Sequence, residues 1–261
     1  MTGEPAGGVV VERRGGVAVI RLAAPPLNLL TQPLRRAITD AVAAVDEADD
    51  VRAAVLTGGD CFCAGADLKE FGVRRDPDVA RDHCRNGHRM TLRLVACAKP
   101  VVAAVEGACL GGGFELALAC DLRVVASDAR LGLPEVARGT FPGTGGLYLL
   151  RRLAGPARAK RLAGTGMIVT ADASVMAEVV DQVTPPGGAL DAALALAATL
   201  AERPAGAVQA VKRLVDHDLA AGLRDYLDAE ERDYVARYRT RDAEEGWNAF
   251  LEKRSPAWTH N

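Results

Sequence analysis

Residues 103–115 decide the fold, and they read AAVEGACLGGGFE. The apolar, valine-rich run 101–105 is typical of a buried strand, and the glycines at 111–113 open a helix that runs through residue 119. Strand, glycine turn and helix recur along the chain, which predicts an α/β architecture of stacked turns.

Other strands and helices flank this unit. Strands are expected at 9–12, 17–22, 53–57 and 122–126, with a hairpin at 13–16, and helices are expected at 33–46 and 78–95. Beyond residue 188 the sequence carries only helical patterns, at 189–201, 205–220 and 223–241. We therefore divide the chain into a core of residues 1–188, which holds the active site, and a C-terminal helical region of residues 189–261.

The composition is ordinary for a globular protein, with 49% hydrophobic and 25% charged residues among 261. A formal net charge of −2 supplies no basic field for nucleic acid or an anionic membrane, and no apolar run is long enough to span a bilayer. Residues 1–8 lack the pattern of a targeting peptide, so we expect a cytoplasmic protein. The six cysteines, at positions 61, 63, 84, 97, 109 and 120, are expected to be reduced thiols used in packing.

Two glutamates, Glu115 and Glu135, lie twenty positions apart, each beside glycine-rich sequence. Two carboxylates can share acid and base work. A third glycine turn, residues 62–68, has backbone N–H groups that can join those of residues 111–113 around one oxygen atom, an arrangement typical of oxyanion chemistry on a carbonyl group. Each glutamate also has a plainer interpretation, since acidic residues are common in a first helical turn, as at Glu115, and Glu135 can be a surface residue after Pro134.

Three segments, 62–68, 103–115 and 133–135, resemble signature segments of the enoyl-CoA hydratase/isomerase (crotonase) family. The resemblance runs nearly end to end, from residue 9 through PPLN at 25–28 to WNAFLEKR at 247–254. It implies a crotonase-like α/β spiral of β-β-α units with a C-terminal helical trimerisation region. It also implies a homotrimer, often paired into a hexamer.

The resemblance implies a role for each matching residue of the reaction centre. The backbone N–H groups of Ala66 and Gly112 would bind the carbonyl oxygen of an acyl thioester, and Glu115 and Glu135 would position a water molecule and move protons. The helix that begins near Gly112 would favour negative charge at that oxygen through its dipole. Which glutamate is the acid and which is the base stays open.

Coenzyme A would bind beside the same turn. By resemblance, its adenine contacts the backbone around Ala64, and Asp67, Leu68 and Lys69 continue the binding turn. Two interpretations of Lys253 stay open, a contact with the CoA phosphates across a subunit boundary and a solvated lysine on a terminal helix.

Together these residues imply an enoyl-CoA hydratase that adds water to trans-2-enoyl-CoA thioesters, with no metal or redox cofactor and with coenzyme A only as part of the substrate. Two glutamates fit hydration, whereas one alone would fit isomerisation. The alternative is therefore an enoyl-CoA isomerase or a specialised acyl-CoA dehydratase. His83 and His88 are five positions apart rather than four, which disfavours a metal site.

RNA binding, through a lysine-studded helix in some family members, is a third class of function. The matching helix at 33–42 has two arginines and is followed by acidic Asp46 and Glu47, so no basic stripe is expected. A serine peptidase on a related spiral would need a serine at a glycine turn, and these turns contain none.

Two departures from the family pattern stand out. Residues 147–150 read LYLL where the family usually continues with Thr or Ser, Gln, Arg and Leu, which concerns the packing behind Glu135. Glu178 stands where the family usually has a glycine. We therefore expect acyl specificity to differ from that of a standard fatty-acid hydratase.

Overall fold

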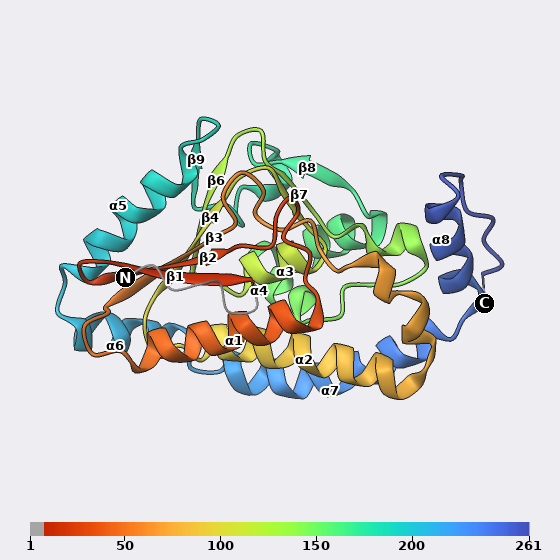
Figure 1. The fold of residues 1–261 in the computed structure, drawn as a ribbon, viewed down its shortest axis with the longest axis horizontal. Helices are drawn as coiled ribbons and strands as arrows, with labels where there is room; N and C mark the ends of the chain where they lie inside the picture. The colour runs from red at the N-terminus through yellow and green to blue at the C-terminus, as the bar shows by residue number, and fades with distance from the viewer. Residues whose placement is uncertain (1–7, 261) are drawn as a thin grey trace.

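The structure, a computed structural model that describes residues 8–260, is built on two β-sheets (Figure 1). The larger sheet has six strands in the order β1-β2-β3-β4-β6-β9, and the smaller has three in the order β5-β7-β8. β1 is antiparallel to β2, and neighbouring strands from β2 to β9 of the larger sheet are parallel. The strands are β1 (Val9–Arg14), β2 (Val17–Leu22), β3 (Ala53–Thr57), β4 (Val101–Val105), β5 (Ala108–Leu110), β6 (Leu122–Ala126), β7 (Arg130–Gly132), β8 (Ile168–Thr170) and β9 (Gln182–Thr184).

Helices pack around these sheets. α1, α2 and α7 lie side by side along one edge of the molecule, and α8 lies at the far end from the N-terminus (Figure 1). The α-helices are α1 (Gln32–Glu47), α2 (Pro77–Val95), α3 (Gly112–Leu118), α4 (Gly146–Thr165), α5 (Ala189–Ala201), α6 (Ala205–Val215), α7 (Leu219–Tyr238) and α8 (Arg241–Leu251). Short 3-10 helices are η1 (Leu68–Glu70), η2 (Gly72–Arg75), η3 (Pro134–Arg138) and η4 (Ser174–Met176).

The two faces of the larger sheet belong to different cores because side chains alternate along a strand. In β3, Ala53 and Val55 pack against buried alanines of α5, whereas Ala54 and Leu56 face the main core. Every residue of β3 and β4 is buried, as expected for parallel strands covered on both faces. The helices after residue 188 therefore pack on the core, α5 against the sheet and α7 against α2.

A tight crossover carries the chain from the larger sheet to the smaller one, between β4 and β5. Gly107 makes the turn with a φ of +60°, and a Cβ there would overlap Asp60 O. The carboxylate of Glu106 accepts hydrogen bonds from the N–H groups of Gly187 at 3.1 Å and Ala189 at 2.8 Å. This crossover leads directly to the glycine run that opens α3.

The expected α/β spiral is confirmed, and the strands expected at 17–22, 53–57 and 122–126 have those bounds. α4 and the strands β5, β7, β8 and β9 were not predicted. Each of these strands has three residues, which is too short to show an alternating pattern. The helix expected at 205–220 is wrong at its end, because a turn in which Leu219 N–H donates to Asp216 O separates α6 from α7. The helix expected at 223–241 is α7, which starts earlier and is followed by α8.

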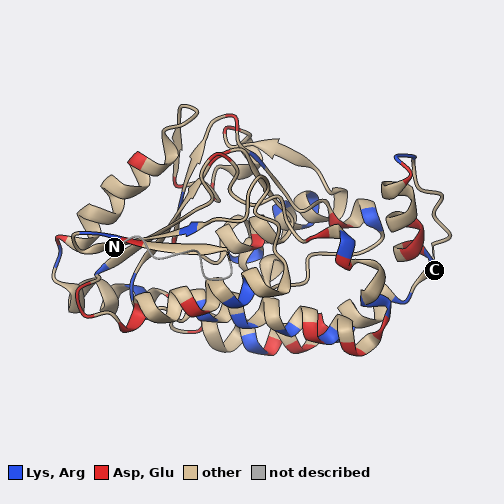
Figure 2. Ribbon diagram, in the orientation of Figure 1, with Lys and Arg blue, Asp and Glu red and all other residues tan. Residues whose placement is uncertain are grey.

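The outer surface is charged without a dominant sign. Figure 2 shows lysine and arginine interleaved with aspartate and glutamate along α1, α2 and α7. Among residues 8–260, no helix combines the length and the apolar character needed to cross a bilayer.

Candidate active site

The candidate site is a pocket of about 460 Å³ at the place where the glycine turns meet. Turn 62–68 pairs with β5, since Cys63 N–H donates to Ala108 O at 2.9 Å and Leu110 N–H donates to Cys63 O at 3.0 Å. Gly65 has a φ of +102°, and a Cβ there would stand 2.8 Å from Leu110 O. Glycine at this position therefore lets turn 62–68 lie close to the start of α3.

Ala66 and Gly112 both line this pocket, and within residues 8–260 neither backbone N–H donates a hydrogen bond to another protein group. Gly112 is the first residue of α3, and the opening N–H groups of a helix have no acceptor inside it. The Gly112 nitrogen lies 3.8 Å from the Cβ position of Gly65, the residue before Ala66. The structure thus brings the two expected donors to one pocket.

Glu115 on α3 is fixed through one of its oxygens. The residue is 2% exposed, and Oε1 accepts hydrogen bonds from the N–H groups of Thr144 and Gly146, both at 2.9 Å. A Cβ on Gly146 would overlap Glu115 Cγ, so glycine is required there. The other oxygen, Oε2, lies 4.0 Å from the Cβ position of Gly112. Oε2 therefore lies beside the opening turn of α3. It is the oxygen of Glu115 that can take part in chemistry.

Glu135 on η3 lies against the same turn. Its Oε1 is 2.6 Å from the Cβ position of Gly111, where φ is +53° and a side chain would not fit. The residue as a whole is half-buried, but its Oε2 is covered and has no hydrogen-bond partner within residues 8–260. Burial, and then the charge of Glu115, raises the pKa of Glu135 to about 8. This carboxyl group therefore carries a proton at neutral pH.

The two carboxyl groups are suited to different chemistry. Both hydrogen bonds to Glu115 fall on Oε1, which leaves Oε2 to accept a proton, and Glu135 has a proton to give. The N–H groups of Ala66 and Gly112 open onto the same pocket and can stabilise negative charge on an oxygen. Titratable groups held in contrasting environments are typical of acid–base sites.

A second buried carboxylate supports the loop that holds Glu115. Glu230 on α7 accepts a hydrogen bond from Gly145 N–H at 2.9 Å through Oε1, and His88 Nε2 lies 3.0 Å from the same oxygen. Cys84 Sγ lies 3.2 Å from His88 Nε2. The loop 143–146 is therefore fixed by carboxylates from two helices, α3 and α7.

Cys84, His88 and Glu230 are also the group of candidate metal ligands within residues 8–260, with ligand atoms within 4.8 Å of one another. Burial raises the pKa of Cys84 far above its usual range, so the sulfur is a thiol rather than the thiolate that metals prefer. Glu230 Oε1 and Cys84 Sγ both approach one ring nitrogen at hydrogen-bond distance. The three side chains fit a hydrogen-bonded cluster better than a metal centre.

The structure places some of the residues expected to bind coenzyme A in the pocket and leaves one outside it. Ala64, Asp67, Leu68 and Lys69 line the pocket, and the Asp67 carboxylate accepts from Lys69 N–H at 2.9 Å to cap η1. Lys253 is exposed and is not among the described residues that line the pocket. Its neighbours Phe250 and Leu251 on α8 do line it.

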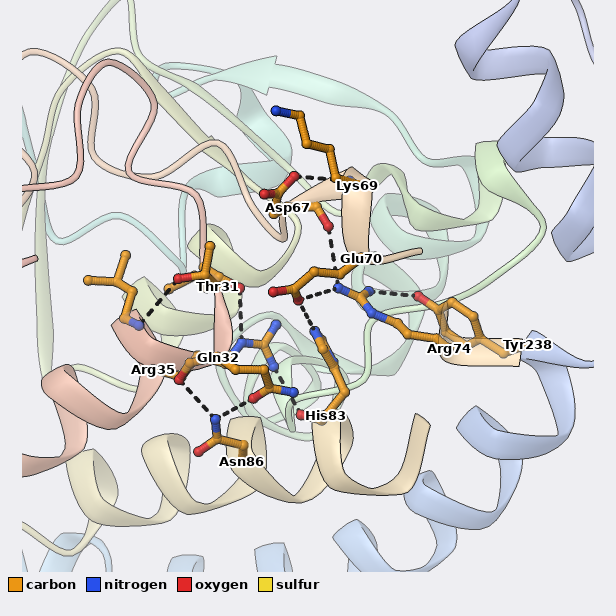
Figure 3. Close-up of polar contacts among 12 residues, drawn as sticks. Thr31, Gln32, Arg35, Asp67, Lys69, Glu70, Arg74, His83, Asn86 and Tyr238 are labelled. Atoms are coloured by element: carbon orange, nitrogen blue, oxygen red, sulfur yellow. Dashed lines mark hydrogen bonds and ion pairs between the residues drawn. The ribbon is translucent and has the colours of Figure 1, made fainter. Parts of the chain in front are cut away.

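Several pocket residues escaped the sequence analysis because they come from distant segments. The polar side chains among them are Arg35, Arg74, His83, Arg138, Thr140, Thr144, Tyr234 and Tyr238. Figure 3 shows Glu70 between Arg74 and His83, with an interaction to each. His83 and His88 lie on the helix expected at 78–95, and the structure buries both. No sequence motif marks these positions.

Known proteins are similar to this chain over nearly its whole length. A family model for enoyl-CoA hydratase/isomerase matches residues 12–261. A probable enoyl-CoA hydratase of Mycobacterium bovis is 35% identical over 254 residues, which cover 97% of this chain and 98% of that protein. The crotonyl-CoA hydratase of Syntrophomonas wolfei is 34% identical over 249 residues, which cover 94% of this chain and 95% of that protein.

Solved structures show the same likeness. The carnitinyl-CoA hydratase of Mycobacterium avium matches with a TM-score of 0.86 and 34% identity, covering 97% of this chain and 99% of that one. An enoyl-CoA hydratase of Bacillus anthracis matches with a TM-score of 0.77 and 32% identity, covering 97% of this chain and all of that one, at 100%.

Proposed function

The chain belongs to the enoyl-CoA hydratase/isomerase family, and from this premise we infer that it adds water across the double bond of trans-2-enoyl-CoA thioesters. The observation that carries the proposal is the pair Glu115 and Glu135, which lie against adjacent glycines of one turn in one pocket. Two carboxyl groups, one able to accept a proton and one able to give it, are what hydration of a conjugated double bond requires.

The thioester carbonyl oxygen would sit between the N–H groups of Ala66 and Gly112. As a water oxygen adds at Cβ, the π electrons move toward the carbonyl and negative charge develops on its oxygen. Donors that are already in place stabilise that charge without rearrangement, and the first turn of α3 adds its unsatisfied N–H groups. The loss of one such donor raises the barrier by roughly 3 kcal/mol.

Glu115 Oε2 would take a proton from the water as the new C–O bond forms, and Glu135 would then give its proton to Cα. The product is the 3-hydroxyacyl thioester. The raised pKa of Glu135 favours this assignment, because the acid must hold its proton at neutral pH. Proton transfer from Glu115 to Glu135 through the next water molecule restores the starting state.

Coenzyme A would lie along the pocket wall formed by Ala64, Asp67, Leu68 and Lys69. Hydration changes no net oxidation state. The backbone N–H donors polarise the thioester carbonyl group, which makes Cβ of the substrate electrophilic. We therefore propose that no metal or redox cofactor takes part. The CoA moiety belongs to the substrate alone.

A spectrophotometric assay tests the proposal. The protein is mixed with crotonyl-CoA, the loss of the conjugated double bond is followed, and the 3-hydroxy product is identified by mass. A parallel assay starts from 3-enoyl-CoA and follows the gain of conjugation. Conversion of the 3-enoyl thioester without hydration of crotonyl-CoA would identify an isomerase instead.

We also propose a homotrimer, or a pair of trimers, as the assembly. The supporting observation is an exposed apolar group on α6, with Val211, Leu214 and Val215 at 63%, 67% and 72% exposure. Light scattering after gel filtration tests the assembly, with Leu214→Glu as the variant expected to weaken it. A monomeric parent protein would contradict the proposal.

A further inference from the structure

Buried polar atoms without partners gather at this pocket. Among residues 8–260, eight buried side-chain nitrogen or oxygen atoms have no hydrogen-bond partner, and six of them belong to residues that line it. The six are Arg74 Nε, His83 Nε2, Glu135 Oε2, Arg138 Nε, Thr140 Oγ1 and Thr144 Oγ1. His83 Nε2 lies 3.4 Å from Glu70 Oε2, but the two atoms do not form a hydrogen bond. Buried polar groups in proteins are normally paired, so this concentration indicates a polar ligand.

Arg74 on η2 is the central cation of this group, with a side chain 2% exposed. Its Nη1 lies 3.1 Å from Tyr238 Oη and 3.5 Å from Tyr234 Oη, and its Nη2 lies 3.3 Å from Glu70 Oε2 (Figure 3). These distances exceed the 2.7–2.9 Å typical of charge-assisted hydrogen bonds. Arg74 Nη2 also donates to Asp67 O at 3.5 Å, whereas its Nε has no hydrogen-bond partner within the described residues and is available to a ligand.

Arg35 on α1 adds a second buried guanidinium, at 1% exposure. Its two hydrogen bonds, both 3.3 Å, go to the backbone oxygens of Leu30 and His83, and within the described residues it has no carboxylate partner. Burial, and then Arg35 and Arg74, lower the pKa of His83 well below its usual range. The carboxylates whose charges act on Arg35 are Glu115, on the reaction-centre side, and Glu70, and no ion pair joins Arg35 to either within the described residues.

This charged group adjoins the reaction centre. A Cβ on Gly143 would overlap the ring of Tyr234, and a Cβ on Gly87 would lie 2.7 Å from Arg35 Nη1 and overlap the Thr144 side chain. Thr144 in turn donates its N–H to Glu115. An acyl chain that extends past Glu115 into the buried part of the pocket therefore meets Arg35, Arg74 and the tyrosines.

We propose that Arg74, together with Arg35 and the phenols of Tyr234 and Tyr238, binds a carboxylate at the far end of the acyl chain. The preferred substrate is then the CoA monothioester of an unsaturated dicarboxylic acid. This inference rests on the proposed function for its acyl-CoA part. The donors left for a ligand are Arg74 Nε and the N–H groups of Arg35 beyond its two hydrogen bonds, and a carboxylate has four acceptor sites and the matching charge.

Equilibrium binding tests the inference without turnover. Calorimetry compares saturated thioesters in pairs of equal length, succinyl with butyryl, glutaryl with valeryl, and adipyl with hexanoyl-CoA. At least one dicarboxylic thioester should bind about tenfold or more tightly than its partner, the usual scale for hydrogen bonds to a charged group. Equal or weaker binding in all three pairs would overturn the inference. So would equally tight binding of a matched thioester that ends in a neutral hydroxyl group.

Variants identify the residues responsible. The preference is the dissociation constant of the monocarboxylic thioester divided by that of its dicarboxylic partner. Arg74→Met should reduce this ratio to about one, and Arg74→Lys should retain part of the preference. Glu70→Gln removes the competing carboxylate and should increase the ratio severalfold. If Glu70→Gln and Arg74→Lys change both members of a pair by the same factor, the cluster serves only the fold and the inference is wrong. If Arg74→Met does not fold, the test rests on Glu70→Gln and on the binding of the three thioester pairs to the parent protein.

The two proposals fail separately. Hydration of crotonyl-CoA with no preference for dicarboxylic thioesters would support the hydratase activity and contradict the carboxylate site. A strong preference in binding without hydration of crotonyl-CoA or glutaconyl-CoA would support the carboxylate site and contradict the hydratase activity.

Discussion

Glu115 and Glu135 lie against adjacent residues of one turn: Glu115 Oε2 is 4.0 Å from the Cβ position of Gly112, and Glu135 Oε1 is 2.6 Å from that of Gly111. A side chain on Gly111 would push the Glu135 carboxyl group away from the turn. The closeness of the two carboxyl groups also has an electrostatic result, because the charge of Glu115 adds to burial in raising the pKa of Glu135.

Replacing either carboxyl group by an amide should disable hydration. We expect Glu115→Gln and Glu135→Gln each to lower kcat for crotonyl-CoA by at least about 100-fold, within the range for the loss of a general acid or base. KM should change little, because the amide keeps the shape of the side chain. Glu178 is exposed, is not among the described residues that line the pocket, and pairs with Arg158 at 2.7 Å, so Glu178→Gln is the matched control and should keep parental kcat. A Glu135→Gln protein with near-parental turnover would refute the two-carboxyl mechanism.

The pKa of Glu135 also predicts a pH profile. With a pKa of about 8 in the folded, ligand-free protein, the acid form is lost as pH rises through 8, so kcat/KM for hydration should fall there. This alkaline limb is measured with crotonyl-CoA well below its KM between pH 6 and 10. A rate that stays level to pH 10 in a protein that remains folded would remove Glu135 as the acid.

Stability should respond with the matching sign. A carboxyl group with a raised folded-state pKa binds its proton more tightly in the folded protein, so its contribution to stability is present below the unfolded pKa and is lost as pH rises toward 8. Glu135→Gln avoids that loss. Its melting temperature relative to the parent should therefore be higher at pH 9 than at pH 5, by at least about 2 °C, as seen by calorimetry. A difference that is the same at both pH values would contradict the raised pKa.

Ala66 tests the backbone donor. Ala66→Ser should stay active because it keeps the N–H, whereas Ala66→Pro removes the hydrogen and should lower kcat by about two to three orders of magnitude. Circular dichroism and gel filtration must show Ala66→Pro folded and assembled like the parent. Parental turnover by such a protein would exclude turn 62–68 from the reaction centre.

The sequence made the reaction centre predictable because its signals are local. Glycines at 65, 111 and 112 and the acidic residues 115 and 135 stand in short motifs. The space at each glycine is limited by neighbouring atoms, so a short motif is enough to mark these positions. Arg35, Arg74, Tyr234 and Tyr238 come from three elements, α1, η2 and α7, and share no motif, so only the fold brings them together. The two-domain division, the assembly and the role of Lys253 stay predictions.

RNA binding should be weak. Of the two arginines that made α1 the candidate, Arg35 is buried, so only Arg36 remains exposed. Figure 2 shows acidic residues along the same group of helices. We expect no binding tighter than micromolar in a gel-shift at physiological salt, where nonspecific contacts to phosphates are weakened. Submicromolar affinity there would contradict this expectation.

Gly146 provides the sharpest steric test of how Glu115 is held. A Cβ at this first residue of α4 would overlap Glu115 Cγ, and Gly146 N–H is one of the two donors to Oε1. Gly146→Ala should therefore displace the carboxyl group and lower kcat by about 100-fold or more, since small misplacements of catalytic groups have effects of that size.

The second segment of α4, beyond the non-helical Gly155 with its φ of 77°, offers a matched control for this substitution. A Cβ on Gly164 would meet nothing within 4 Å, so Gly164→Ala should keep parental kcat and raise the melting temperature slightly, because alanine favours a helix over glycine by about 1 kcal/mol. Kinetics and thermal melts of both variants separate the position of Glu115 from general effects on α4. Equal, near-parental kcat in the two variants would show that Glu115 tolerates displacement, which a fixed catalytic carboxylate cannot.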